Sequence, residues 1–247
     1  MTPTEFIRLI IFLPSSIYKR RMALLSPHDP DDLIFEHLAG APDGFYSAPL
    51  PDSFSLRTAD LVARDQKTRG TCVAFAAAVL AKLVKKACID LSPEWIYRLR
   101  TNPRTEGMHA RNALQILQRV GIVSEASLPY RDNDKPIILD QALYTEASLN
   151  RLDGFSRITT QDGLKRSLLE TRVPLVAIVE HYNSSAVFWR PDYAGQSVGY
   201  HAVSIVGYSP EGVQLLNSWG PTWADDGYSL IPWDDWSRVR EIWAVSE

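Results

Sequence analysis

The stretch from Thr71 to Ala87 constrains the fold of this 247-residue chain most strongly. Alanine, valine, leucine and phenylalanine cover nearly every face of a helix drawn through it, and lysines gather only in its last turns, at Lys82, Lys85 and Lys86. A helix that is apolar all round must be buried. The lysines complement the negative end of the helix dipole. The sequence therefore predicts a buried central helix around which the rest of the chain packs.

The segments on the two sides of a turn-rich stretch at 129–136 differ in character. Before it, Ser92 followed by Pro93 is typical of a helix N-terminus, and a further helix is expected from about Ala110 to Val120. After it, a short helix is expected at 160–171. Several β-branched runs follow and indicate an antiparallel sheet, at 175–179, 202–206, 214–216 and 228–231. We therefore predict an α+β fold with a helical lobe at about 60–135 and a sheet-rich, barrel-like lobe at about 136–247. A groove between the lobes is the expected place for a site.

Residues 1–50 are expected to form an N-terminal extension ahead of a catalytic domain at 51–247. The extension contains an apolar run, Phe6 to Leu13, a basic triplet at 19–21 and a proline-rich segment. The run is shorter than the ~20 residues of a membrane-spanning helix, and no small-residue cleavage site follows it. We expect no signal peptide, no stable membrane insertion, and an extension packed across the back of the lobes.

Charge and cysteine content narrow the partners and the compartment. The net charge is −3 with both signs spread along the chain, so no basic face for nucleic acid is expected. The two cysteines, Cys72 and Cys88, would lie about 24 Å apart along one helix, too far for a disulfide. Scarce cysteines favour a reducing compartment: the cytoplasm, or the cytosol of a host or target cell. Cys88 is expected to be a packing residue.

Cys72 is the candidate nucleophile, because it opens the predicted central helix. Unsatisfied N–H groups at a helix N-terminus stabilise a thiolate, although most free cysteines are buried packing residues. Gln66 lies six residues upstream, where its amide could donate to an oxyanion beside the sulfur. Downstream, His201 begins a buried strand, and Asn217, which precedes Ser218 and Trp219, could orient the imidazole.

The motifs around these residues resemble the papain/cathepsin cysteine peptidases. They are Asp65-Gln66-Lys67-Thr68-Arg69-Gly70-Thr71-Cys72, His201-Ala202-Val203, and Asn217-Ser218-Trp219-Gly220 continuing to Tyr228. In that family the His and Asn follow the Cys by ~130–150 residues. Here they follow it by 129 and 145 residues. The resemblance spans about residues 51–231. Within the family, the chain is similar to a bacterial-type member without disulfides.

The resemblance implies a papain-like fold and a role for each matching residue. Cys72 attacks, His201 transfers the proton, Asn217 orients His201, and Gln66 donates to the oxyanion. It also implies that Trp219 and Trp223 shield the base, and that Gly107, Met108 and Trp219 bind substrate. The implied partners are a protein or peptide substrate and a protein inhibitor or regulator, and no cofactor is implied.

The sequence departs from the family pattern at four positions. Val73 stands where a Trp usually follows the nucleophile, and Arg69 stands where the family has a cysteine three residues before it. Thr71 replaces a frequent Ser, and Tyr200 precedes the His where a smaller residue is common. Val73 and Tyr200 bear on substrate specificity. Because Arg69 replaces that cysteine, the disulfide that the family forms there cannot form.

Other candidate sites have plainer interpretations. His109 and His181 have no partner at metal-ligand spacing, so we expect no metal site and read each as a surface or core residue. The acidic cluster near the C-terminus fits a solvated turn better than a calcium loop; its members are Asp225, Asp226, Asp234 and Asp235.

Three functional alternatives remain open from the sequence. The leading one is a thiol peptidase that cleaves peptide bonds through a thioester. An acyltransferase on the same fold would use the same residues. A catalytically inert binding module or effector is the third, and it is disfavoured because Gln66, Cys72, His201 and Asn217 are all present.

Overall fold

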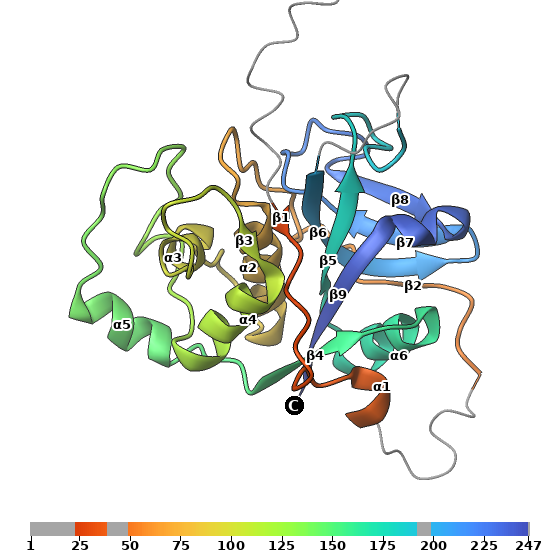
Figure 1. Cartoon of the computed structure of the whole chain (residues 1–247), viewed down its shortest axis with the longest axis horizontal. Coiled ribbons are helices and arrows are strands. Elements are labelled where there is room, and N and C mark those ends of the chain that lie inside the picture. The colour runs from red at the N-terminus through yellow and green to blue at the C-terminus, as the bar shows by residue number, and fades with distance from the viewer. Residues whose placement is uncertain (1–22, 39–48, 192–198, 247) are drawn as a thin grey trace, which may run out of the picture.

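The computed structural model describes residues 23–38, 49–191 and 199–246. In these residues a helical lobe and a sheet-rich lobe lie side by side (Figure 1). The helices are α1 (Phe35–Leu38), α2 (Cys72–Val84), α3 (Pro93–Arg98), α4 (Ala110–Arg119), α5 (Gln141–Ser148) and α6 (Gln161–Thr171), with a 3₁₀ helix, η2 (Trp233–Arg238). None of the helices in these ranges is long and apolar enough to cross a membrane.

Helix α2 is the buried central helix that the sequence predicts. It packs against α3 and α4 on one side and against the sheet on the other. The helix ends at Val84, earlier than expected, and Lys86 adopts a left-handed backbone (φ 48°) just beyond it. Cys88 therefore lies past the helix and is exposed. The expectation that Cys88 packs in the core is wrong.

The sheet is mostly antiparallel and runs in the order β3-β1-β6-β5-β9-β4. Strand β6 also pairs with β7 and β2, and β7 with β8. The strands are β1 (Ala23–Leu24), β2 (Phe54–Ser55), β3 (Met108–His109), β4 (Gly154–Ile158), β5 (Leu175–His181), β6 (Gly199–Ser209), β7 (Gly212–Leu216), β8 (Tyr228–Pro232) and β9 (Val239–Ser246). A two-residue turn at 210–211 joins β6 to β7, which fixes their register, with Ser209 opposite Gly212.

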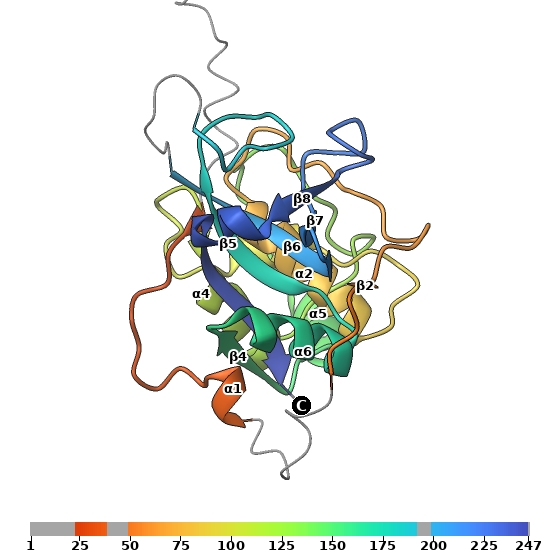
Figure 2. The ribbon, with the colours of Figure 1, turned by 90° about the vertical axis from the view of Figure 1, so that its right-hand side faces the viewer.

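Strand β5 separates the two main cores of the molecule. Its first five residues, 175–179, are all apolar because both faces of this part of the strand are buried. Val176 and Ile178 face the core shared with α2, whereas Ala177 and Val179 face the core inside the sheet lobe. This alternation is the period of two that a strand imposes. Figure 2 shows β5 and β6 lying over α2.

Helix α5 belongs to the helical lobe, which moves the expected lobe boundary. The side chain of Asp140 caps α5 by accepting from the backbone N–H of Leu143. Tyr144 meets Trp95 of α3 edge-on, with ring centroids 5.0 Å apart. Leu152 still packs in the same core. The helical core therefore includes residues up to about 152, beyond the predicted lobe boundary near 135, because Ala147 of α5 is buried in it and Leu143 packs against it.

The described part of the N-terminal segment lies between the lobes rather than across their back. Ala23 of β1 pairs with Met108 in parallel and with Tyr200 in antiparallel orientation. The backbone N–H of Ser26 then donates to the buried carboxylate of Glu241 at 2.9 Å. The segment follows the front seam down to α1 in Figure 1. The expectation that the extension packs across the back is therefore wrong for residues 23–38. Residues 1–22 and 39–48 lie outside the described residues, and the expected boundary of the extension at residue 50 stays a prediction.

Candidate active site

Cys72 is the first residue of α2 and is completely buried. Thr71 occupies the N-cap position, but its side chain makes no capping hydrogen bond. Its hydroxyl lies 3.0 Å from the hydroxyl of Tyr130 instead. The first N–H groups of α2 are thus left uncapped by Thr71. Their partial positive charge favours a thiolate over a thiol at Cys72.

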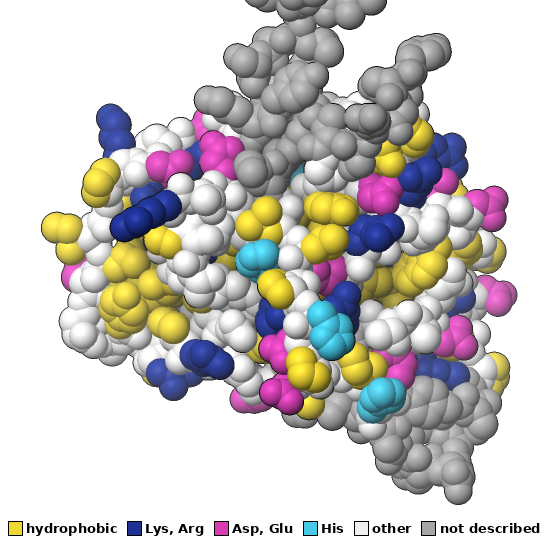
Figure 3. All heavy atoms as spheres, viewed as in Figure 1, with side chains coloured by type: hydrophobic (Ala, Val, Ile, Leu, Met, Phe, Trp, Pro, Cys, Tyr) yellow, Lys and Arg dark blue, Asp and Glu magenta, His cyan; other side chains and the backbone are white. Residues whose placement is uncertain are grey.

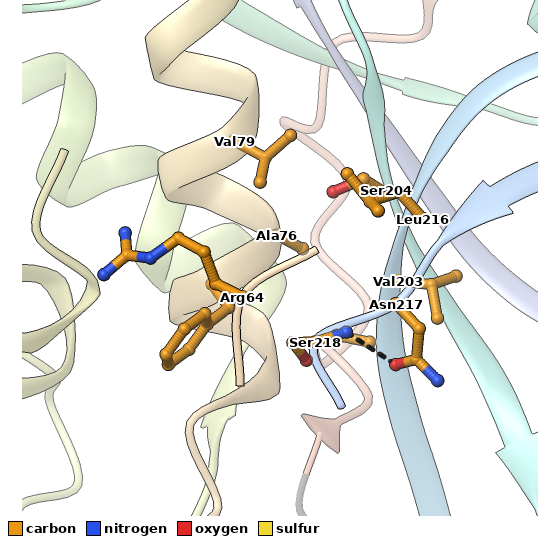
Figure 4. Close-up of a pocket in the computed structure, with 10 residues that line it drawn as sticks. Arg64, Ala76, Val79, Val203, Ser204, Leu216, Asn217 and Ser218 are labelled. Carbon is orange, nitrogen blue, oxygen red and sulfur yellow. Dashed lines mark hydrogen bonds between the residues drawn. The ribbon is translucent and has the colours of Figure 1, made fainter. Parts of the chain in front are cut away.

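His201 lies near the start of β6 and bonds to Asn217. The two atoms, His201 Nε2 and Asn217 Oδ1, are 2.7 Å apart. The same Oδ1 accepts the backbone N–H of Ser218 at 2.8 Å, the dashed bond in Figure 4. Because a backbone N–H can only donate, the amide orientation of Asn217 is fixed, and Nε2 of His201 must carry a proton. In the neutral ring, Nδ1 is therefore the basic nitrogen.

Aromatic rings enclose His201. The ring of Trp219 lies over it, with centroids 4.7 Å apart and planes tilted by 34°. Phe188 meets the imidazole edge-on at 5.3 Å, and Trp223 meets Trp219 in the same way, also at 5.3 Å. Trp219 and Phe188 are buried. Exclusion of water by these rings strengthens the bond between His201 and Asn217.

Gln66 connects the loop before Cys72 to the loop that carries Asn217. Its backbone N–H donates to the carbonyl of Ser218 at 2.9 Å, and its side-chain Oε1 accepts the Ser218 hydroxyl at 2.7 Å. Its Nε2 donates to the carbonyl of Arg69 at 2.8 Å. The side-chain amide carries a second N–H as well. The fold thus brings two predicted site residues, Gln66 and Asn217, onto adjoining loops.

A small cavity marks where α2 meets β6. It measures about 10 Å³, room for about one water molecule, and Figure 4 shows the helix on one side of it and the strands on the other. Phe75 and Ala76, one turn after Cys72, line it opposite Ala202, which follows His201. The N-terminal turn of α2 and the start of β6 therefore face each other, which puts Cys72 and His201 on opposing elements.

The residues predicted to bind substrate fall in two places. Gly107 has a left-handed backbone (φ 80°), and its N–H donates to the hydroxyl of Tyr97 at 3.2 Å. Met108 is buried in β3, where Ala23 pairs with it. Trp219 instead lies against His201 in the sheet lobe. Gly107 and Met108 thus lie on the helical lobe, with β1 between them and β6.

Sequence reasoning missed His181 and Phe188 as neighbours of His201. The ring of His181 is fully buried, 5.8 Å from His201 and 5.6 Å from Trp219 between centroids. Strand β5 places it there, because Val179 pairs with His201 and His181 with Gly199. Strand register was the missing signal, since the sequence shows the two runs but not how they align. Within the described ranges, no group of three His, Cys, Asp or Glu residues could hold a metal ion.

Comparison with known proteins identifies the family. The model of the papain family of cysteine proteases matches residues 50–237. Peptidase 1 of Psoroptes ovis is 25% identical over 202 residues, which cover 74% of this chain and 61% of that protein. The crystal structure of xylellain, a cysteine protease from Xylella fastidiosa, superposes with a TM-score of 0.80 at 21% identity, covering 93% of this chain and 97% of that one.

A further neighbour was solved as a complex. The cysteine protease CMS1MS2 of Carica candamarcensis, solved in complex with E-64, has a TM-score of 0.58 at 22% identity and covers 80% of this chain and 99% of that one. The chain spans about three fifths of the length of the curated relatives it matches.

These matches and the two-lobed arrangement show that the chain belongs to the papain family of cysteine proteases. The predicted α+β, papain-like fold is confirmed. Among the described residues, neither Cys72 nor Cys88 forms a disulfide.

Proposed function

We propose that this protein is a cysteine peptidase that hydrolyses peptide bonds through Cys72, His201 and Asn217. The observation that carries the proposal is the orientation of His201. Asn217 Oδ1 accepts the Nε2–H of His201, so Nδ1 is the basic nitrogen that would take the proton of a thiol. Cys72 begins a helix that faces the strand of His201, and the positive end of that helix favours its thiolate.

The proposed reaction is acyl transfer in two halves. The Cys72 thiolate attacks the peptide carbonyl carbon, and the resulting oxyanion accepts hydrogen bonds from the Gln66 side chain and the Cys72 backbone N–H. The C–N bond breaks as His201 gives its proton to the leaving amine, which leaves a thioester on Cys72. Water, losing a proton to His201, then attacks the thioester, releases the acid and restores the thiol.

Substrate backbone is proposed to bind along Gly107 and Met108, across from Tyr200. Ala23 of the chain itself pairs with Met108 and Tyr200 at this place. A peptide that pairs with the same strand edges would therefore have to displace β1. Cys72 and His201 have no exposed surface as the chain stands, which supports the same conclusion.

Two further partners and one alternative follow from the same site. E-64, the ligand of the CMS1MS2 complex, is expected to bind at Cys72 here. A protein inhibitor would compete for the edges of β3 and β6. An acyltransferase would differ only in the group that resolves the thioester, an amine in place of water.

The test is the hydrolysis of fluorogenic peptidyl amides by the chain, with Cys72→Ser and Cys88→Ser compared. Cys88 is the matched control, because it is the other of the two cysteines, is exposed and lies outside the site. Loss of hydrolysis in Cys72→Ser with full activity in Cys88→Ser supports the proposal. A product that appears only with an added amine acceptor would assign an acyltransferase. If neither hydrolysis nor acyl transfer occurs, before or after limited proteolysis of the N-terminal segment, the result would contradict the proposal and support an inert binding module.

A further inference from the structure

The carbonyl of Arg69 fixes the position of the Gln66 amide. It accepts Gln66 Nε2–H at 2.8 Å and the backbone N–H of Thr71 at 2.8 Å. On its other side, the Gln66 amide is held through Oε1 by the Ser218 hydroxyl. The side chain proposed to donate to the oxyanion therefore takes its position from the backbone of residue 69. Whatever anchors that backbone sets where the donor lies.

The side chain of Arg69 anchors this backbone to the helical lobe. It is only 5% exposed, and its Nη1 donates to Glu94 Oε2 at 2.6 Å. Its Nη2 reaches Asp134 at 2.7 Å, and Nη1 also bonds to the carbonyl of Arg131. The opposite charges hold the pKa of Arg69 above its usual value despite the opposing effect of its burial, so the guanidinium stays charged.

Two aromatic rings complete the enclosure of the guanidinium. Its carbon lies 4.9 Å from the ring centroid of Tyr97 and 5.4 Å from that of Tyr130. The hydroxyl of Tyr130 donates to the carbonyl of Gln66 at 2.5 Å, so the same ring also holds the loop from its other end. Since that hydroxyl has one hydrogen, it must accept from Thr71.

A buried charge at this position has a high desolvation cost. Glu94 has no exposed side-chain surface, and taking both charges out of water offsets much of their attraction. Net stability is therefore a weak explanation for the pair. Geometry is a stronger one, because a planar guanidinium with donors in a fixed fork determines position more tightly than a single point charge.

We propose that Arg69 is a positioning residue for the acyl-transfer step, holding the Gln66 amide where the oxyanion forms. Its ion pair with Glu94 fixes the loop at the position where the family usually has a cysteine. A charge-based anchor of this kind does not depend on redox conditions. The proposal rests on the oxyanion role of Gln66 given above.

The test compares kcat and KM for a peptidyl amide with the rate at which iodoacetamide alkylates Cys72. Alkylation needs the thiolate but forms no oxyanion, so it separates the donor from the nucleophile. Gln66→Ala is expected to lower kcat by about 10²-fold, the effect of removing one oxyanion donor. Arg69→Met is expected to lower kcat by about 10-fold, with KM and the alkylation rate changed less than about twofold.

A double variant decides whether Arg69 acts through Gln66. In the Gln66→Ala background, Arg69→Met should lower kcat no further, because the donor it positions is gone. Multiplicative losses in the double variant would overturn the inference and leave the proposed function intact. An unchanged kcat in Gln66→Ala would remove the oxyanion role itself, and the inference with it.

Two more variants distinguish a loss of positioning from misfolding of Arg69→Met. Arg69→Lys keeps a charge opposite Glu94 but loses the fork, so it should fold and retain a kcat between those of the wild type and Arg69→Met. Arg98→Met is the matched control, because Arg98 pairs with the other oxygen of Glu94, at 2.6 Å from Oε1, and has no bond to residues 66–71 among the described contacts. Its kcat should be unchanged. Equal losses of kcat in Arg98→Met and Arg69→Met would contradict a positioning role for Arg69.

Discussion

The two halves of the candidate site are held by different kinds of contact. On the helical side, the loop before Cys72 is anchored by the ion pairs of Arg69 with Glu94 and Asp134. On the sheet side, His201 is held by a β-ladder and by the rings of Trp219 and Phe188. Charges fix one half, and apolar rings fix the other.

The difference follows from what each half must provide. His201, the proposed base, needs a surrounding without water, because water would compete for its bond to Asn217. Aromatic rings supply that surrounding and bring no charge that would perturb the imidazole. The loop before Cys72 is proposed to place the N–H donor of Gln66 at a defined position, and the forked ion pair of Arg69 restricts position more tightly than a point charge does. The predictions below test this division of roles.

The largest effect is expected from the base itself. His201→Ala should lower kcat/KM for a peptidyl amide by about 10⁴-fold, because both the proton acceptor and the cation beside the thiolate are lost. Steady-state kinetics with active-site titration measures the change. A loss smaller than about tenfold would mean that another group serves as the base. His181, the second buried histidine in this cluster, would then be the first residue to test.

A smaller loss is expected when the orientation of the base is removed. Asn217→Ala should lower kcat by about 10²-fold with KM nearly unchanged, since it fixes the ring without contacting substrate. The rings of Trp219 and Phe188 should still hold the imidazole in part. If Asn217→Ala were as inactive as His201→Ala, the aromatic enclosure would contribute nothing to positioning.

Two carboxylates that each pair with two arginines offer a matched comparison of stability. Glu94 is fully buried between Arg69 and Arg98, whereas Glu180 pairs with the more exposed Arg238 and Arg240. Glu94→Gln should lower the free energy of unfolding by about 3 kcal/mol, because it leaves buried cations underpaired. Glu180→Gln should cost less than about 1 kcal/mol. Urea titrations measure both, and equal losses would contradict the special role of buried charge on the helical side.

The smallest effect is expected on the free energy of unfolding at alkaline pH. Burial raises the pKa of Tyr130 to about 12, from an ordinary value of 10.0. The folded protein therefore keeps this proton where the unfolded chain loses it, so the stabilisation is complete below pH 10 and is lost as the pH rises from 10 to 12. Tyr130→Phe should make the free energy of unfolding fall less steeply across that window. The same slope in both proteins would mean that Tyr130 does not titrate with unfolding.

The sequence predicted the elements that local patterns specify. Ser92 caps α3 through Trp95 N–H, as Ser-Pro predicts, and the apolar runs at 175–179 and 202–206 became β5 and β6. It did not predict α5, β4 or β9. Helix α5 buries only Ala147, so its pattern is weak, and β4 and β9 are defined by pairing with each other.

Residues of the candidate site could be predicted where they lie in a sequence motif. Contacts between residues far apart in the chain could not be predicted. Gln66, Cys72, His201 and Asn217 could be named because each lies in a recognisable stretch. The contact of Gln66 with Ser218 joins residues 152 positions apart, and the ring contact of His181 with His201 depends on strand register. Nor could the pairing of Ala23 with Met108 and Tyr200 be read from the extension, because two residues of strand leave no pattern.

The central claim is that Cys72 and His201 form a thiolate–imidazolium pair. The direct measurement is the rate at which a peptidyl irreversible thiol reagent labels Cys72 between pH 4 and 9, with the adduct located by mass spectrometry and His201→Ala as the comparison. The account predicts fast labelling of Cys72 at acidic pH that is lost in His201→Ala. Slow labelling that rises only near the ordinary cysteine pKa of ~8.5, alike in both proteins, would contradict it.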